Sequence, residues 1–313
     1  MGRDHRTLAW LLTLSVVFEL LLLRTATRTL IHIPGTDRFE TVVRLLAEGG
    51  RVSYYVAALC LVIALLLVGR AGIRTPDRRR VAAGLASGTF LVVAAAGRLE
   101  VVAWTTVGWV SLATLVTAAV AGWRGLRSVP VGLFLVGSVA AGTSVLGQTI
   151  STPLTGGRIE ALIWVSEIFL VLAGVTAPLL LRYPPTRAAL YAGVAATLVV
   201  AGAASSSSST MSILLLWNVG VPGWLPGLAY AIAVGALTAT LWSAVARGEG
   251  VVVAGIILLV AGGVGTISTY QTGLVLMAVL TLGGLGGDVF AEPPAAEVPN
   301  PAGETVASPV SVS

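Results

Sequence analysis

Ten apolar stretches separated by short polar loops dominate this sequence. A helix needs about 17 to 25 apolar residues to cross the hydrocarbon core of a bilayer, and several stretches lie near the lower limit. Within that layer each backbone polar group must be paired inside the protein, and no alternating barrel pattern is present. The predicted fold class is therefore all-α, a polytopic integral membrane helix bundle with about ten transmembrane helices: 8–23, 53–69, 81–97, 101–122, 129–148, 161–181, 188–203, 224–245, 250–267 and 271–289.

Composition supports the same interpretation. Of 313 residues, 56% are hydrophobic and 11% are charged, and the mean hydropathy is +0.93. Soluble domains carry about 25% charged residues, and disordered chains are polar, so both classes are excluded. We expect a multi-pass protein of the cell membrane whose first partner is the lipid bilayer.

The arginines predict the orientation in the membrane. All 19 basic residues are arginine, and outside segment 24–52 they favour the loops on the N-terminal side by twelve to two. Short cytoplasmic loops are enriched in basic residues, so both termini are predicted to be cytoplasmic. Because the arginines flank apolar runs, we attribute the net charge of +5 to residues that set the orientation in the membrane, and nucleic acid is not an expected partner.

The segments at the two ends have different predicted roles. Residues 1–23 are expected to form an uncleaved first helix, since Glu19 interrupts the apolar stretch and no convincing cleavage site follows. Segment 24–52 is expected outside, as an amphipathic helix on the membrane surface or under a partner, or as a solvated loop. Residues 291–313 are predicted to be a disordered cytoplasmic tail.

An internal repeat is the most informative pattern in the chain. Residues 124–149 align without gaps to 247–272, and nine of the 26 positions are identical. Apolar helices match by chance fairly often, whereas polar pairs in the same order are harder to explain that way. These pairs are Arg124-Gly125 with Arg247-Gly248, and Gln148-Thr149 with Gln271-Thr272.

The repeat predicts a duplication of four-helix units. The first unit would be 53–149, and the second 158–272 with an inserted external loop at 204–223, while the last helix, 271–290, lies outside the repeat. Four helices are an even number, so the two units would have the same orientation, related by a pseudo-two-fold axis along the membrane normal.

Polar side chains within the spans are the candidate site residues, because ionisable groups in hydrocarbon are costly. Under the predicted topology all of them fall in the outer half of the membrane, at one depth, as a shared ligand or proton-pathway site would require. They are Glu19, Thr143, Gln148, Glu167, Thr266 and Gln271.

Each candidate has a structural alternative. Glu167 is expected either to handle protons or bind a polar ligand head group, or to be a neutral carboxyl bonded to a neighbouring helix. Glu19 can pair with Arg24 near the interface. Gln148 and Gln271 could clamp a ligand by symmetry, or cap helix ends and join helices.

Several chemistries are excluded by missing residues. Cys60 is the only cysteine, and both histidines, His5 and His32, lie outside the apolar segments. Neither a metal site nor the usual pair of haem ligands can be assembled from these residues. No catalytic motif is present, and the protein is not expected to be an enzyme by itself.

Two function classes fit these features. The first is an integral membrane subunit without its own metal or haem, an anchor in a larger complex of the redox or electron-transport kind, with protein subunits on its outer face. No cofactor is evident, and a quinone would fit. In architecture the chain resembles membrane subunits of the polysulfide-reductase type, whose motifs it lacks. The alternative is a secondary transporter of a small solute, because ten helices with both termini inside suit that class.

Overall fold

A computed structural model describes residues 2–32, 37–74, 76–123, 128–149, 156–206, 224–263 and 268–285. The predicted tail at 291–313 and most of the predicted external loop lie outside these residues. The described chain forms ten α-helices and one short 3-10 helix, η1. Their bounds are α1 Gly2–His32, α2 Asp37–Arg74, α3 Arg78–Arg98, α4 Trp104–Gly122, α5 Ser128–Thr149, α6 Gly156–Thr176, η1 Ala177–Leu180, α7 Arg187–Ser206, α9 Trp224–Ala246, α10 Gly250–Gly263 and α11 Thr269–Leu282.

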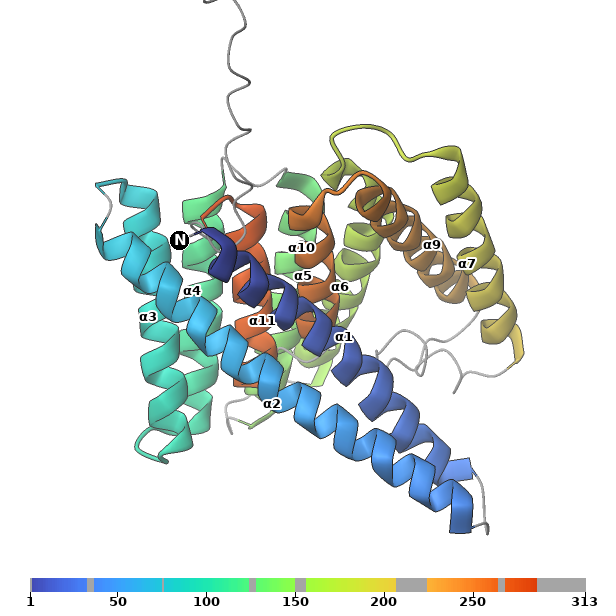
Figure 1. Cartoon of the computed structure of the whole chain (residues 1–313), viewed down its shortest axis with the longest axis horizontal. Coiled ribbons are helices and arrows are strands. Elements are labelled where there is room, and N and C mark those ends of the chain that lie inside the picture. Colours follow the sequence, from blue (N-terminus) through green and yellow to red (C-terminus); the bar gives the residue numbers. More distant parts are fainter. Residues whose placement is uncertain are drawn as a thin grey trace, which may run out of the picture.

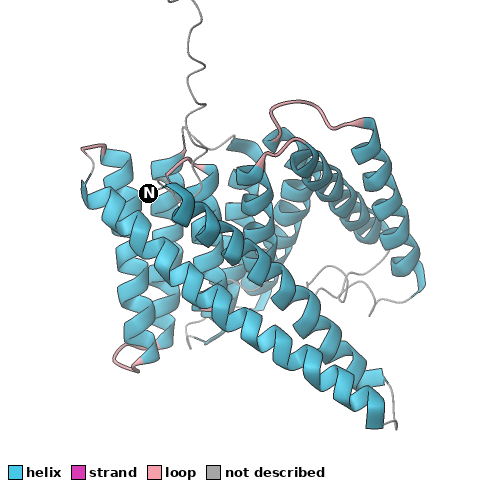
Figure 2. Cartoon of the chain, in the orientation of Figure 1, coloured by secondary structure: helices cyan, strands magenta, loops and turns pink. Residues whose placement is uncertain are grey.

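Successive helices run in opposite directions, so α1 begins and α11 ends at the same side of the bundle (Figure 1). The described part of the chain is helical apart from its connecting turns (Figure 2). Seven of the helices are long and apolar enough to cross a membrane, and three shorter ones are apolar too. The prediction of an all-α, multi-pass membrane protein is therefore confirmed. We call the side at which α1 begins the N-terminal face.

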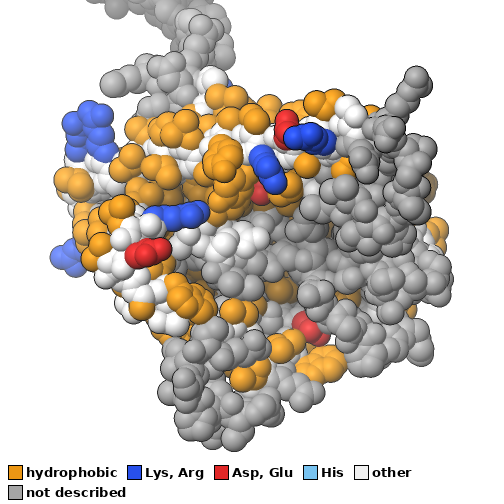
Figure 3. Space-filling model, turned by 90° about the horizontal axis from the view of Figure 1, so that it is seen from below, with side chains coloured by type: hydrophobic (Ala, Val, Ile, Leu, Met, Phe, Trp, Pro, Cys, Tyr) orange, Lys and Arg blue, Asp and Glu red, His pale blue; other side chains and the backbone are white. Residues whose placement is uncertain are grey.

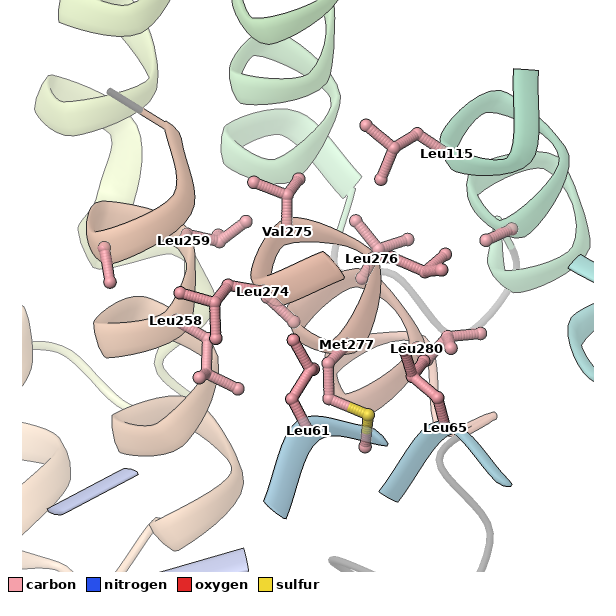
Figure 4. Close-up of a cluster of buried hydrophobic side chains, with 14 of the residues drawn as sticks. Leu61, Leu65, Leu115, Leu258, Leu259, Leu274, Val275, Leu276, Met277 and Leu280 are labelled. Carbon is pink, nitrogen blue, oxygen red and sulfur yellow. The ribbon is translucent and has the colours of Figure 1, made fainter. Parts of the chain in front are cut away.

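The core of the bundle is built around α11. Every residue from Thr272 to Thr281 is buried, so this helix presents no face to the outside. Leucines from α2, α4 and α10 surround it (Figure 4): Leu61, Leu65, Leu115, Leu258 and Leu259. Such packing requires apolar residues on all sides of α11, which its sequence TYQTGLVLMAVLTL supplies.

Helices α1 and α2 pack along each other and form a long antiparallel hairpin. The structure differs here from the prediction of a separate amphipathic helix at 24–52. Residues 24–32 continue α1, and residues 37–52 continue α2 without a break. Gly49 and Gly50 allow a close crossing of the two helices. A Cβ atom added at Gly50 would lie 2.7 Å from the backbone nitrogen of Leu23.

Helix α7 packs against α9, and the two form a pair at one edge of the bundle (Figure 1). Their contact depends on glycines at the crossing. A Cβ atom at Gly193 would lie 2.7 Å from the backbone oxygen of Gly235, and one at Gly235 would overlap Thr197. Small residues of this kind let membrane helices approach closely, where packing rather than water exclusion drives association.

Loops at the N-terminal face are fixed by polar contacts. Arg247 donates from Nη1 to the backbone oxygen of Tyr183 over 2.9 Å, and from Nη2 to that of Pro184. Its guanidinium also lies 5.8 Å from the centre of the Tyr183 ring. The turn after α9 is thereby joined to the segment between η1 and α7. At the start of α3, Asp77 caps the helix, and its side chain accepts a hydrogen bond from the Arg79 N–H over 3.1 Å.

Apolar side chains cover much of the described surface. In a view along the bundle from the side opposite the N-terminal face, hydrophobic side chains lie among a few arginines and acids (Figure 3). Large exposed hydrophobics include Leu59, Val92 and Leu198. A soluble monomer rarely exposes contiguous apolar patches of more than a few hundred Å², whereas a lipid-facing surface is expected to look this way.

Candidate functional site

Three helices contribute a polar cluster on the side opposite the N-terminal face. The Tyr270 hydroxyl, on α11, donates a 2.7 Å hydrogen bond to Oε2 of Glu19 on α1. The ring of Tyr54, on α2, contacts the Tyr270 ring edge to face, with 4.6 Å between centroids. All three side chains are half-buried. We call these residues the Glu19 cluster.

The position of the Glu19 cluster follows from the short helices α10 and α11. Each has 14 residues, which corresponds to about 21 Å, less than the roughly 30 Å of hydrocarbon. Helix α10 starts near Arg247 at the N-terminal face, so the shortfall lies at the other side. The first turn of α11 is therefore recessed below that side, and this recessed turn carries Tyr270.

A cap satisfies the backbone at the start of α11. The Ser268 hydroxyl accepts from the Gln271 N–H over 3.2 Å and donates to Oε1 of Gln271 over 2.9 Å. Both bonds involve the Ser268 hydroxyl: serine caps the helix, and the side chain of Gln271, three residues later, accepts from the same hydroxyl. In the structure Gln271 therefore takes part in the cap of α11, through bonds that are exposed.

An elongated apolar cavity lies elsewhere in the bundle, between α1, α5, α6, η1, α9 and α10. Its volume is about 380 Å³, within the range of about 300 to 1,000 Å³ that is usual for ligand pockets. Tyr230 and Thr238 are the polar side chains among the described residues that line it. Its walls include Leu20, Phe134, Leu170, Leu180, Leu237 and Ile256.

Glu167 lies close to one end of this cavity. It shares a face of α6 with Leu170 and Gly174, three and seven residues on, and both of these line the cavity. It is half-buried and lies close enough to Tyr230 of α9, whose side chain is 3% exposed, for the two side chains to interact electrostatically. One end of the cavity is therefore lined by Tyr230, with Glu167 close to it, and the rest of the described lining is apolar apart from Thr238.

The predicted site residues do not form a single site in the described structure. Glu19 and Gln271 both lie at the recessed start of α11, each with its own partner. Glu167 lies beside Tyr230 instead. Thr143 is half-buried on α5, whereas the side chain of Gln148 and the whole of Thr266 lie outside the described residues.

Sequence reasoning missed the tyrosines. Tyr54, Tyr230 and Tyr270 each lie within or at the end of an apolar helix, and each now accompanies a candidate carboxylate. A phenol in hydrocarbon needs a partner for its hydroxyl, much as an amide or carboxyl does. Scoring tyrosine as a polar group inside spans would have found all three.

The side chains described above offer hydroxyl and carboxyl groups as hydrogen-bonding partners. Among the described residues, no three His, Cys, Asp or Glu side chains gather closely enough to bind a metal ion. Comparisons with protein-family models, with curated proteins and with solved structures find no match to the chain. The function must therefore be argued from the geometry alone.

Proposed function

We propose that the protein is an integral membrane anchor subunit of a larger complex, without its own metal or haem, and that it interacts with a quinone. The observation that carries the anchor role is the α1–α2 hairpin. With 31 and 38 residues, these helices exceed the roughly 20 that a simple crossing needs. The end of the hairpin extends past the other helices, on the side opposite the N-terminal face (Figure 1).

The extended part of α2 presents a surface suited to a partner protein. Val43 and Gly50 face α1 and are buried. On another face, Leu45, Glu48, Val52 and Tyr55 follow at intervals of three and four residues, and all are exposed. We call these four residues the outer stripe. A charged residue such as Glu48 is unfavourable against lipid, and an exposed leucine such as Leu45 is unfavourable in water. A face that carries both is better suited to contact with another protein.

Native mass spectrometry of the protein purified from its own membranes in mild detergent tests the anchor role. We expect a complex heavier than the single chain, in fixed stoichiometry. The double variant Leu45→Glu/Val52→Glu should release the partner. Leu99→Glu, at an exposed loop position 75% accessible, is the matched control and should keep it. A bare chain in every preparation would overturn the anchor role.

The orientation and the duplication belong to the same proposal. The arginine bias supports placing both termini in the cytoplasm, with the outer stripe outside. Some helix adjacencies support two four-helix units: α3 packs on α4 as α7 packs on α9, and α4 contacts α5 as α9 contacts α10. An experimental structure in lipid should superpose these units by a rotation of about 180° around the membrane normal.

A secondary transporter is the competing function, and the same purified protein distinguishes it. Reconstituted into liposomes, the chain alone should show no solute uptake driven by an imposed pH gradient. Uptake by the chain alone would favour transport.

A further inference from the structure

From its shape, charge and polar end, we infer that the apolar cavity between α1, α6, α9 and α10 binds an isoprenoid quinone, with the head group beside Tyr230 and Glu167. The inference rests on the proposed function, which names a quinone without giving it a place or contacts.

The shape of the cavity suits a chain rather than a compact solute. Along α9 the lining extends from Tyr230 to Leu241, and along α6 and η1 from Leu170 to Leu180. At 1.5 Å per residue, each wall is about 15 Å long. Most of the lining along this length is aliphatic, which suits an isoprenoid tail.

The charge of the cavity selects a neutral head group. Its described lining includes no arginine, although arginine accounts for every basic residue in the chain. A phospholipid head carries a phosphate, which proteins usually hold with basic side chains or exposed N–H groups. A phospholipid would therefore leave its charge unmatched here, whereas a quinone ring carries none.

The polar end of the cavity matches the hydrogen bonding of a quinone. A phenol donates one hydrogen bond, and a carboxyl in its neutral form donates another. Quinone carbonyl oxygens are acceptors, so Tyr230 and Glu167 can both serve them. Thr238 already donates to the backbone oxygen of Val234 over 2.8 Å and is left as part of the wall.

The test measures quinone retained by the full-length protein, purified in mild detergent from membranes of the expression host. Organic extracts are analysed by absorbance and mass spectrometry for quinone and phospholipid. We expect about one quinone per chain in the wild type. Ala173→Phe fills the cavity and should reduce retention at least tenfold. Val175→Phe adds a similar side chain on the exposed side of α6, and should retain quinone like the wild type.

A second variant covers the case in which Ala173→Phe folds poorly, as judged by size-exclusion chromatography and melting temperature. Tyr230→Phe adds no volume and removes one donor. Titration of delipidated protein with decylubiquinone should then show an affinity about threefold to tenfold weaker than that of the wild type, the usual effect of one hydrogen bond.

Several results would overturn the quinone site. They are stoichiometric phospholipid in place of quinone, no bound lipid, equal quinone in Ala173→Phe and Val175→Phe, or unchanged affinity in Tyr230→Phe. Retained quinone in a chain that never assembles with a partner would overturn the anchor role alone. An assembled complex without quinone would overturn this site alone.

Discussion

The Tyr270 hydroxyl donates to Oε2 of Glu19 over 2.7 Å, and the two residues are 251 positions apart in sequence. The bond connects the first described helix to the last described one. It forms at the start of α11 and is partly buried. Loss of this bond should therefore lower the stability of the packing between α1 and α11.

Tyr270→Phe removes the hydroxyl and keeps the ring against Tyr54. We expect a cost of about 1 to 3 kcal/mol, because a polar group in the interior loses its partner. Thermal melting in detergent measures it. Tyr55→Phe is the control, since Tyr55 is 69% exposed and its loss should change little. Glu19→Gln retains an acceptor oxygen and should lie near the wild type. A Tyr270→Phe protein as stable as Tyr55→Phe would show that the bond contributes nothing.

Gly193→Ala should separate α7 from α9. The new methyl group would meet the backbone oxygen of Gly235 at 2.7 Å, and backbone cannot yield as a flexible side chain does. Overpacking of this kind costs about 1 to 3 kcal/mol. Gly202→Ala on the same helix is the matched control, because nothing lies within 4 Å of its added Cβ. Melting temperatures should fall for the first variant and stay level or rise for the second.

Arg247→Lys should loosen the connection at the N-terminal face. Lysine keeps the charge but cannot direct two N–H groups at the two backbone oxygens of Tyr183 and Pro184. We expect a loss of about 0.5 to 1.5 kcal/mol, since the contact is exposed. Limited proteolysis between η1 and α7 should become faster. Arg74→Lys, exposed at the end of α2, makes the same chemical change and should not alter the cleavage pattern.

Leu276→Ala probes the core around α11. In water, such a change costs about 2 to 5 kcal/mol, from lost transfer energy and from the cavity left behind. Lipid is as apolar as leucine, so only the packing part remains, and we expect about 2 kcal/mol. Leu66→Ala, 57% exposed on α2, should cost far less. Equal losses for both variants would mean that α11 is not the packing centre.

Cysteine labelling checks the orientation. Buried Cys60 is first replaced by serine, which removes the native thiol. A cysteine at Arg74 should then react only from the cytoplasm, and one at Leu99 only from outside. Both positions are exposed in the structure. The reverse pattern would invert the bundle and place the outer stripe in the cytoplasm.

Hydropathy predicted the helices well where their ends coincide with polar loops. The expected span at 129–148 is α5, Ser128–Thr149, and that at 224–245 is α9, Trp224–Ala246. It failed where a helix continues beyond its apolar part, as α2 does through Arg44 and Glu48. Those two side chains form an i, i+4 ion pair over 3.6 Å, which supports the helical conformation of this polar part of α2.

The site was less predictable than the fold. Sequence placed Glu19, Glu167 and Gln271 at a similar depth, but depth does not specify which helices are neighbours. The partners depend on packing: Tyr270 bonds to Glu19 because α11 is central, and Tyr230 lies near Glu167 because α6 packs on α9. The cavity is likewise a product of packing, since no single helix contains it.

The burial of α11 has a consequence for how the protein is made. A ribosome delivers the chain from its N-terminus, so the helix that fills the centre emerges after the nine other described α-helices. Until α11 is inserted, lipid must fill its place among the nine earlier α-helices of the described chain. A chain that stops before Thr269 could therefore insert each of those helices and still lack the segment that gives them a common interior. We expect such a product to insert into the membrane and then to be degraded by membrane proteases, because its helices lack a packed core.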